Sequence, residues 1–105
     1  MEEVELFFDA IGNKNRFRIL NELLKNDMCP RELEKKLGIK QTNLSHDLKC
    51  LVNCRFVNVK KIGRNRFYSI TPQTKRIIID INKHIKSYSS YLTHCKILGD
   101  KYGKV

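Results

Sequence analysis

The sequence contains four cysteines, whose thiols can bind metal ions or be oxidised, and two of them are spaced to act together. Cys50 and Cys54 are four residues apart, so in a helix their thiols project from one flank. Two thiolates one turn apart supply half of a site for a soft metal ion such as Zn²⁺, Cd²⁺, Pb²⁺ or Cu⁺. The same thiols are open to oxidation, so a redox response is the alternative to metal binding.

The expected compartment decides whether these cysteines are thiols or disulfides. The acidic start, Met1-Glu2-Glu3-Val4-Glu5, lacks the basic-then-apolar layout of a secretory signal, so we expect a cytoplasmic protein. In a reducing cytoplasm, cysteines are more often free thiols or metal ligands than disulfides. No stretch approaches about 20 consecutive apolar residues, so we expect no membrane-spanning helix.

Positive charge is the second feature that predicts a partner. The 105 residues carry 21 Lys and Arg against 11 Asp and Glu, a formal net charge of +10. The excess is densest in residues 40–66, where seven bases accompany Asp47 as the single acid. Because crowded like charges repel one another, we expect a phosphate-rich partner and predict binding to double-stranded DNA. Ordinary solvated lysines or an anionic membrane surface are the alternatives.

Hydrophobic periodicity predicts the elements that position these residues. Pro30 suits the first turn of a short helix, in which Glu32 helps to cap the start and Gly38 ends it. A turn with Gly63 and Asn65 separates two short β-type segments. The predicted elements are helices near 4–11, 17–26, 30–37 and 41–54, strands at 57–60 and 66–70, and a long helix from 71–72 to about 98.

This order of elements predicts the fold class. Two short helices joined by Gly38-Ile39-Lys40 have the layout of a helix-turn-helix, and the basic hairpin after them has the layout of a wing. We therefore expect a mainly α protein with a small β-hairpin, a winged helix-turn-helix. Residues 1–98 are predicted to form one domain, with the dimerisation helices at both ends, and residues 99–105 a polar tail.

A helical count of about 100° per residue divides residues 41–54 into faces. Leu44, Leu48 and Leu51 form a buried stripe, with polar side chains such as His46 and Asn53 opposite. His46 has a second interpretation as a metal ligand or titrating switch, although a plain polar contact is preferred. The predicted DNA contacts are Lys40, Gln41, Thr42, Asn43, Ser45, His46, Lys49, Lys60, Lys61, Arg64 and Arg66.

Five motifs carry a resemblance to a known family. They are Ile19-Leu20 with Leu23-Leu24, Arg31-Glu32-Leu33, Leu37-Gly38-Ile39, Leu44-Ser45-His46-Asp47-Leu48, and Gly63-Arg64 with Tyr68. Over residues 6–95 the chain resembles the ArsR/SmtB family of winged-helix repressors. The resemblance implies a homodimer, built from the first and last helices, on a palindromic operator. It also implies that a metal or thiol-reactive signal releases the DNA.

The cysteines sharpen this resemblance. Residues 48–57 are similar to cadmium- and lead-sensing members of the family, in which two cysteines of the recognition helix join a third from the C-terminal region. This implies that Cys50, Cys54 and Cys95 bind Cd(II), Pb(II) or Zn(II) as an effector that folding does not require. Cys95 also suits a packed apolar position, and Cys29 is favoured as a helix-start residue rather than a ligand. Arg55 stands where the family usually has glycine, so the turn after the helix is in question.

Other functions are less well supported by the residues. A zinc site on the last helix would use Asp80, but Asn82 stands where a histidine is needed, and His84 and His94 do not fit the spacing. No Gly-rich phosphate loop, nucleophile elbow or carboxylate pair is present, so we predict that the chain is not an enzyme and has no small-molecule substrate. The prediction is a metal-released repressor; a thiol-redox-responsive or ligand-independent DNA-binding protein is the alternative.

Overall fold

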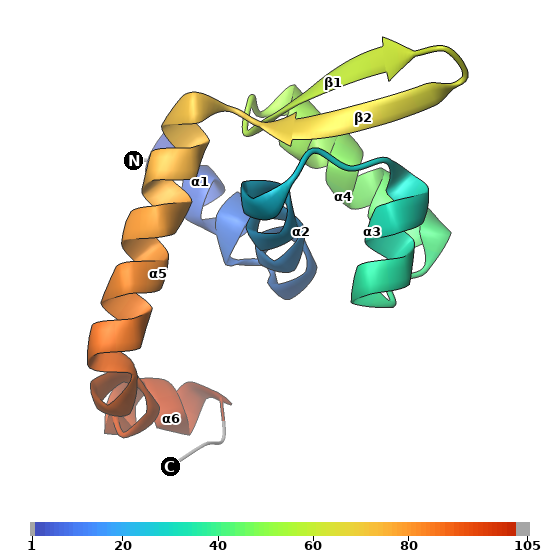
Figure 1. The fold of residues 1–105 in the computed structure, drawn as a ribbon. Helices are drawn as coiled ribbons and strands as arrows, with labels where there is room; N and C mark the ends of the chain where they lie inside the picture. Colours follow the sequence, from blue (N-terminus) through green and yellow to red (C-terminus); the bar gives the residue numbers. More distant parts are fainter. Residues whose placement is uncertain (1, 103–105) are drawn as a thin grey trace. The chain divides into compact units, whose positions relative to one another are not determined.

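A computed structural model describes residues 2–102 of the chain (Figure 1). It confirms the predicted class, mainly α with one antiparallel hairpin. The described elements are α1 (Glu2–Gly12), α2 (Lys14–Lys25), α3 (Pro30–Leu37), α4 (Gln41–Asn53), β1 (Val57–Ile62), β2 (Asn65–Ile70), α5 (Pro72–Thr93) and α6 (Lys96–Tyr102).

The chain divides into two compact units, one up to Lys75 and one from Arg76 onward. The first unit holds α1 to α4, the hairpin and the start of α5, and α2 contacts α1, α3, α4 and β2. Its centre is made of branched aliphatic side chains that water does not reach, among them Ile19, Leu20, Leu33, Leu44, Leu48, Leu51 and Val57. The second unit holds the rest of α5 and α6. No helix in residues 2–102 is long and apolar enough to cross a membrane.

The ends of α3 follow the sequence signals. Pro30 begins the helix, and the Cys29 backbone N–H donates to Oε1 of Glu32 at 3.1 Å. That hydrogen bond lowers the pKa of the Glu32 carboxyl group, because it stabilises the charged form. Gly38 ends the helix with a φ of 65°, a left-handed conformation that glycine adopts without a steric penalty.

The hairpin is longer than predicted. β1 and β2 pair from Val57 opposite Ile70 to Ile62 opposite Asn65, so Asn65 belongs to a strand and not to the turn. The turn is the dipeptide Gly63-Arg64, and the positive φ of Gly63, 63°, fits a type II′ turn between twisted strands.

The C-terminal helix was predicted to continue to about Leu98, and this is wrong. α5 ends at Thr93, and Tyr88 already departs from helical geometry with φ −123° and ψ 18°. The carbonyl oxygen of Ser90 accepts hydrogen bonds from Thr93 Oγ1 at 3.2 Å and from His94 Nδ1 at 2.7 Å. The same oxygen also accepts the backbone N–H of His94 at 3.1 Å, so the two side-chain bonds add to the helical bond in the last turn of α5.

The region after this break is helical again. α6 takes residues 96–102, which include the start of the segment predicted as a polar tail. Residues 103–105 of that segment lie outside the described residues.

Candidate nucleic-acid interface and thiol pair

The predicted recognition helix presents two distinct faces. On α4, Leu44, Leu48 and Leu51 are buried in the first unit. The side chains predicted to contact DNA are all exposed, both on the segment 40–49 and on the hairpin: Lys40, Gln41, Thr42, Asn43, Ser45, His46, Lys49, Lys60, Lys61, Arg64 and Arg66. This placement makes each of them available to a partner, and their role in DNA contact stays a prediction.

A hollow of about 360 Å³ joins the recognition helix to the wing. Ser45, Lys49 and Asn53 of α4 line one side, and Arg66 and Tyr68 of β2 line the other. Within residues 2–102 neither Lys49 nor Arg66 forms an ion pair. Free cations suit phosphate oxygens, and hydroxyl and amide groups suit base edges. The hollow therefore contains hydrogen-bond donors of the kinds that contact DNA phosphates and bases.

An ion pair anchors the recognition helix from its buried side. Arg16 of α2 lies 3.1 Å from Asp47 of α4, measured from Nη1 to Oδ1. This pairing was not predicted from the sequence, where Asp47 stands as the single acid of a basic segment and within one of the family motifs. A signal was present, because Asp47 lies about 60° from Leu44 around the helix, at the edge of the leucine stripe. An acid at that position predicts a buried partner.

Cys50 and Cys54 lie together at the end of α4. They line a hollow of about 430 Å³ with His46, Lys49 and Asn53. Cys50 is half-buried and Cys54 exposed. Burial raises the pKa of the Cys50 thiol, the positive charge of Arg16 opposes that rise, and the charge of Cys54 and a hydrogen bond with it add to it. The two thiols are donors that suit a soft metal ion.

The helix α4 ends one residue earlier than predicted, and the turn after it has the conformation that glycine favours. Cys54 was predicted inside the helix, but the helix ends at Asn53 and Cys54 caps it, donating its N–H to the Cys50 carbonyl at 3.0 Å. Arg55 follows with a φ of 65°. It therefore keeps the left-handed turn that glycine favours, at a steric cost of about 1 kcal/mol.

The other predicted or considered ligands belong to other segments of the chain. Cys95 belongs to the second unit, between α5 and α6, and is half-buried. Cys29 precedes α3, where its backbone N–H is bonded by Glu32, in keeping with a helix-start role. No group of three His, Cys, Asp or Glu residues is placed to hold a metal within the part of the chain that the structure describes. Cys50 and Cys54 are thus a partial donor set.

Sequence comparison identifies similar proteins. A family model described as "Bacterial regulatory protein, arsR family" matches residues 13–59, from the cap of α2 into β1. The chain is 28% identical over 69 residues to "Transcriptional repressor SmtB homolog" from Synechocystis, covering 66% of this chain and 52% of that protein. It is 31% identical over 64 residues to "Probable mercury resistance operon repressor" from Streptomyces lividans, covering 61% and 51%. The chain thus aligns with about half the length of these two relatives.

A third relative is similar in both sequence and structure. Over 72 residues the chain is 31% identical to "Transcriptional activator HlyU" from Vibrio cholerae, covering 69% of this chain and 67% of that protein. The solved structure of HlyU gives a TM-score of 0.71 at 28% identity and covers 78% of this chain and 90% of the HlyU chain. A structure of reduced HlyU gives 0.69 at 27% identity, covering 83% and 90%. All three relatives are named as transcription regulators, which agrees with the prediction that the chain is not an enzyme.

Proposed function

The chain belongs to the ArsR/SmtB family of winged-helix transcriptional regulators, and from this premise we propose that it is a homodimeric repressor released from its operator by a soft metal ion. One observation carries the proposal: the helix with the exposed polar face, α4, also carries the thiol pair Cys50 and Cys54. A ligand held by those thiols acts directly on the element that reads DNA.

Operator binding follows from the charges and shape of the first unit. α4 enters the major groove with Ser45, Lys49 and Asn53 toward the bases, and the wing cations meet phosphates. Each phosphate contact releases counterions, so affinity falls as salt rises. A regulator that binds chromosomal DNA in this way works in the cytoplasm.

Dimer formation is supported by apolar side chains that each unit leaves uncovered. In α1, Leu6 and Phe8 are 60% and 59% exposed; further along, Tyr91 and Ile97 are 75% and 82% exposed. Large apolar groups on first and last helices are typical of an interface with a second copy. A two-fold dimer matches a palindromic operator.

The thiols provide the means of release. Cd(II), Pb(II) or Zn(II), when bound, supplies strong bonds to thiolate sulfur. Cys50 and Cys54 would hold the ion, and the resemblance to cadmium- and lead-sensing relatives supports Cys95 as a third thiolate. Cys54 caps α4, so drawing its sulfur toward Cys50 changes the end of the recognition helix. Release requires that the ion bind the DNA-free form more tightly than the DNA-bound form.

Separate observations support two other effectors for a regulator with this fold. The relative "Probable mercury resistance operon repressor" points to mercury as a further soft metal. The shared hollow of Cys50 and Cys54, with Cys54 exposed, favours a thiol-redox sensor as the second candidate function. In that case hydrogen peroxide accepts two electrons and two protons from the thiols, a disulfide forms, and two waters leave.

A titration on DNA separates these possibilities. The operator is first selected by the protein from a random duplex pool, and gel shifts are then run with Cd²⁺, Pb²⁺, Zn²⁺, Hg²⁺ or peroxide. Release by a metal that disappears in Cys50→Ser, Cys54→Ser and Cys95→Ser supports the metal sensor. Cys29→Ser is the matched control and is expected to respond as the wild type does. Release by peroxide alone favours the redox sensor, and no release by any agent leaves a ligand-independent binder.

A further inference from the structure

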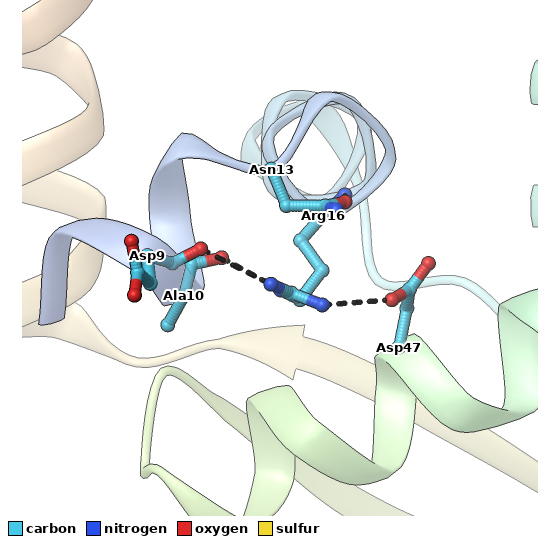
Figure 2. Close-up of polar contacts among 5 residues, drawn as sticks. All are labelled: Asp9, Ala10, Asn13, Arg16 and Asp47. Atoms are coloured by element: carbon cyan, nitrogen blue, oxygen red, sulfur yellow. Dashed lines mark hydrogen bonds and ion pairs between the residues drawn. The ribbon is translucent and has the colours of Figure 1, made fainter. Parts of the chain in front are cut away.

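One guanidinium group joins the recognition helix, on its buried side, to two other helices. Arg16 of α2 donates from Nε to the Ala10 carbonyl at 2.7 Å and from Nη2 to the Asp9 carbonyl at 3.1 Å, both near the end of α1. Its Nη1 donates to Oδ1 of Asp47 on α4 at 3.1 Å. Figure 2 shows the guanidinium lying between the two carbonyls and the carboxylate. The recognition helix is thus tied, through Asp47, to the end of the first helix.

The chemistry of this contact makes it a rigid link. A guanidinium is planar and always charged, and its donors point in fixed directions, so three acceptors fix its position. The side chains of Arg16 and Asp47 are 16% and 9% exposed, so little water is available to replace either partner. Charge-assisted hydrogen bonds in such surroundings are stronger than neutral ones. A lysine would keep the charge but lose the directed bonds.

We propose that Arg16 is a positioning residue for operator recognition, which sets the placement of α4 through Asp47 without itself contacting DNA. The inference rests on the proposed DNA-binding function. Asp47 lies beside His46 and near Lys49 in the chain, and both of these side chains are exposed on the polar face. A helix moves as a rigid body over one turn, so a shift of Asp47 shifts those side chains too. Hydrogen bonds to base edges weaken steeply with small misplacements.

A positioning role predicts a specific pattern of DNA binding. Misplacing α4 weakens base contacts but leaves the wing cations free to meet phosphates. We expect loss of affinity for the selected operator, with unchanged affinity for a scrambled duplex and an unchanged salt slope. A residue that contacted phosphate would instead reduce the slope by about 1.

The test replaces the pair without leaving a buried charge. The double variant Arg16→Met with Asp47→Leu exchanges the ion pair for apolar side chains of similar size, a change that folds tolerate. Arg16→Lys is the second variant, because it keeps a cation beside Asp47. Arg18→Met is the matched control: Arg18 also lies on α2 and donates to a backbone carbonyl, that of Leu37, at 2.8 Å, but not to α4. Circular dichroism checks folding, and fluorescence anisotropy measures both duplexes at several salt concentrations.

The outcomes separate the inference from the function on which it rests. We expect the ratio of operator to scrambled affinity to fall about tenfold in the double variant, to fall less in Arg16→Lys, and to stay within about twofold in Arg18→Met. If the double variant folds and keeps the wild-type ratio, the positioning role is overturned and the proposed function is not. If the double variant does not fold, the same result with Arg16→Lys overturns the positioning role. So does equal loss of affinity for both duplexes. A wild-type protein that does not discriminate between duplexes overturns the proposed function and the inference with it.

Discussion

The two compact units differ in what surrounds their apolar side chains. In the unit up to Lys75, Ile19 and Leu20 of α2 and the three leucines of α4 are buried against their own chain. From Arg76 onward Ile78 is buried, but Tyr91, Leu92 and Ile97 remain exposed. In the proposed function, the buried part of the first unit builds the DNA-reading geometry within one chain, whereas the C-terminal helices, together with Leu6 and Phe8 of α1, carry a surface suited to a second copy.

Truncating one leucine in each unit gives the largest expected contrast. Leu20→Ala removes a fully buried side chain and is expected to lower the free energy of unfolding by about 2–5 kcal/mol. Leu92→Ala removes a half-exposed one and should change it by less than about 1 kcal/mol at protein concentrations too low for dimers. Urea denaturation followed by circular dichroism measures both. Equal losses would show that the units do not differ in this way.

Charges placed on the exposed apolar surface test the C-terminal unit. The double variant Tyr91→Asp with Ile97→Asp is expected to raise the dimer dissociation constant by about tenfold or more, because burying a charge opposes association. Sedimentation equilibrium measures the constant. Lys35→Asp, on an exposed position of α3, is the control and should leave it unchanged. If both changes act alike, the effect is one of net charge rather than of this surface.

Removing single cations separates DNA contact from general positive charge. Lys49→Ala, at the hollow between α4 and the wing, is expected to weaken operator binding several-fold and to reduce the salt slope by about 1. Lys83→Ala removes the same charge from α5 and should leave the slope as it is. Anisotropy titrations at four salt concentrations give both values, and identical slopes for the two variants would contradict the assignment of the DNA face.

The smallest effect concerns the Cys50 thiol of the first unit. Because burial raises the pKa of Cys50, less of it is thiolate at pH 8 than for an ordinary cysteine. Iodoacetamide should alkylate it more slowly than a free thiol, with the gap closing above the raised pKa. The neutral thiol favours the fold below the ordinary thiol pKa, and that stabilisation is lost as pH rises through the raised pKa. Mass spectrometry of a variant with serine at the other three cysteines measures the rate; alkylation as fast as a free thiol would contradict the shift.

Local signals predicted most of the fold. Pro30, Glu32 and Gly38 act within a few residues of one another, so the start and end of α3 were readable from the sequence. The end of α5 was not, because apolar residues such as Leu92 and Ile97 occur on both sides of the helix end at Thr93, so periodicity does not mark that boundary.

The candidate site could likewise be predicted only where local helical geometry determines it. Exposure of the polar face and proximity of Cys50 and Cys54 follow from helical geometry, and both were predicted. The Arg16–Asp47 pair was missed because its partners are 31 residues apart and meet only after α2 and α4 have packed.

The attachment of the wing has a consequence for how the chain folds. Met28 and Tyr68 exchange two backbone hydrogen bonds, of 3.1 Å and 2.8 Å, and so pin β2 to the segment before α3. This bridge encloses α3, α4 and β1 in a single closed loop of the chain. Loop closure is entropically unfavourable until the long-range contact forms, so the helix-turn-helix and the wing are expected to fold as one cooperative unit. Their amide hydrogens should then exchange with solvent together, in the same global openings.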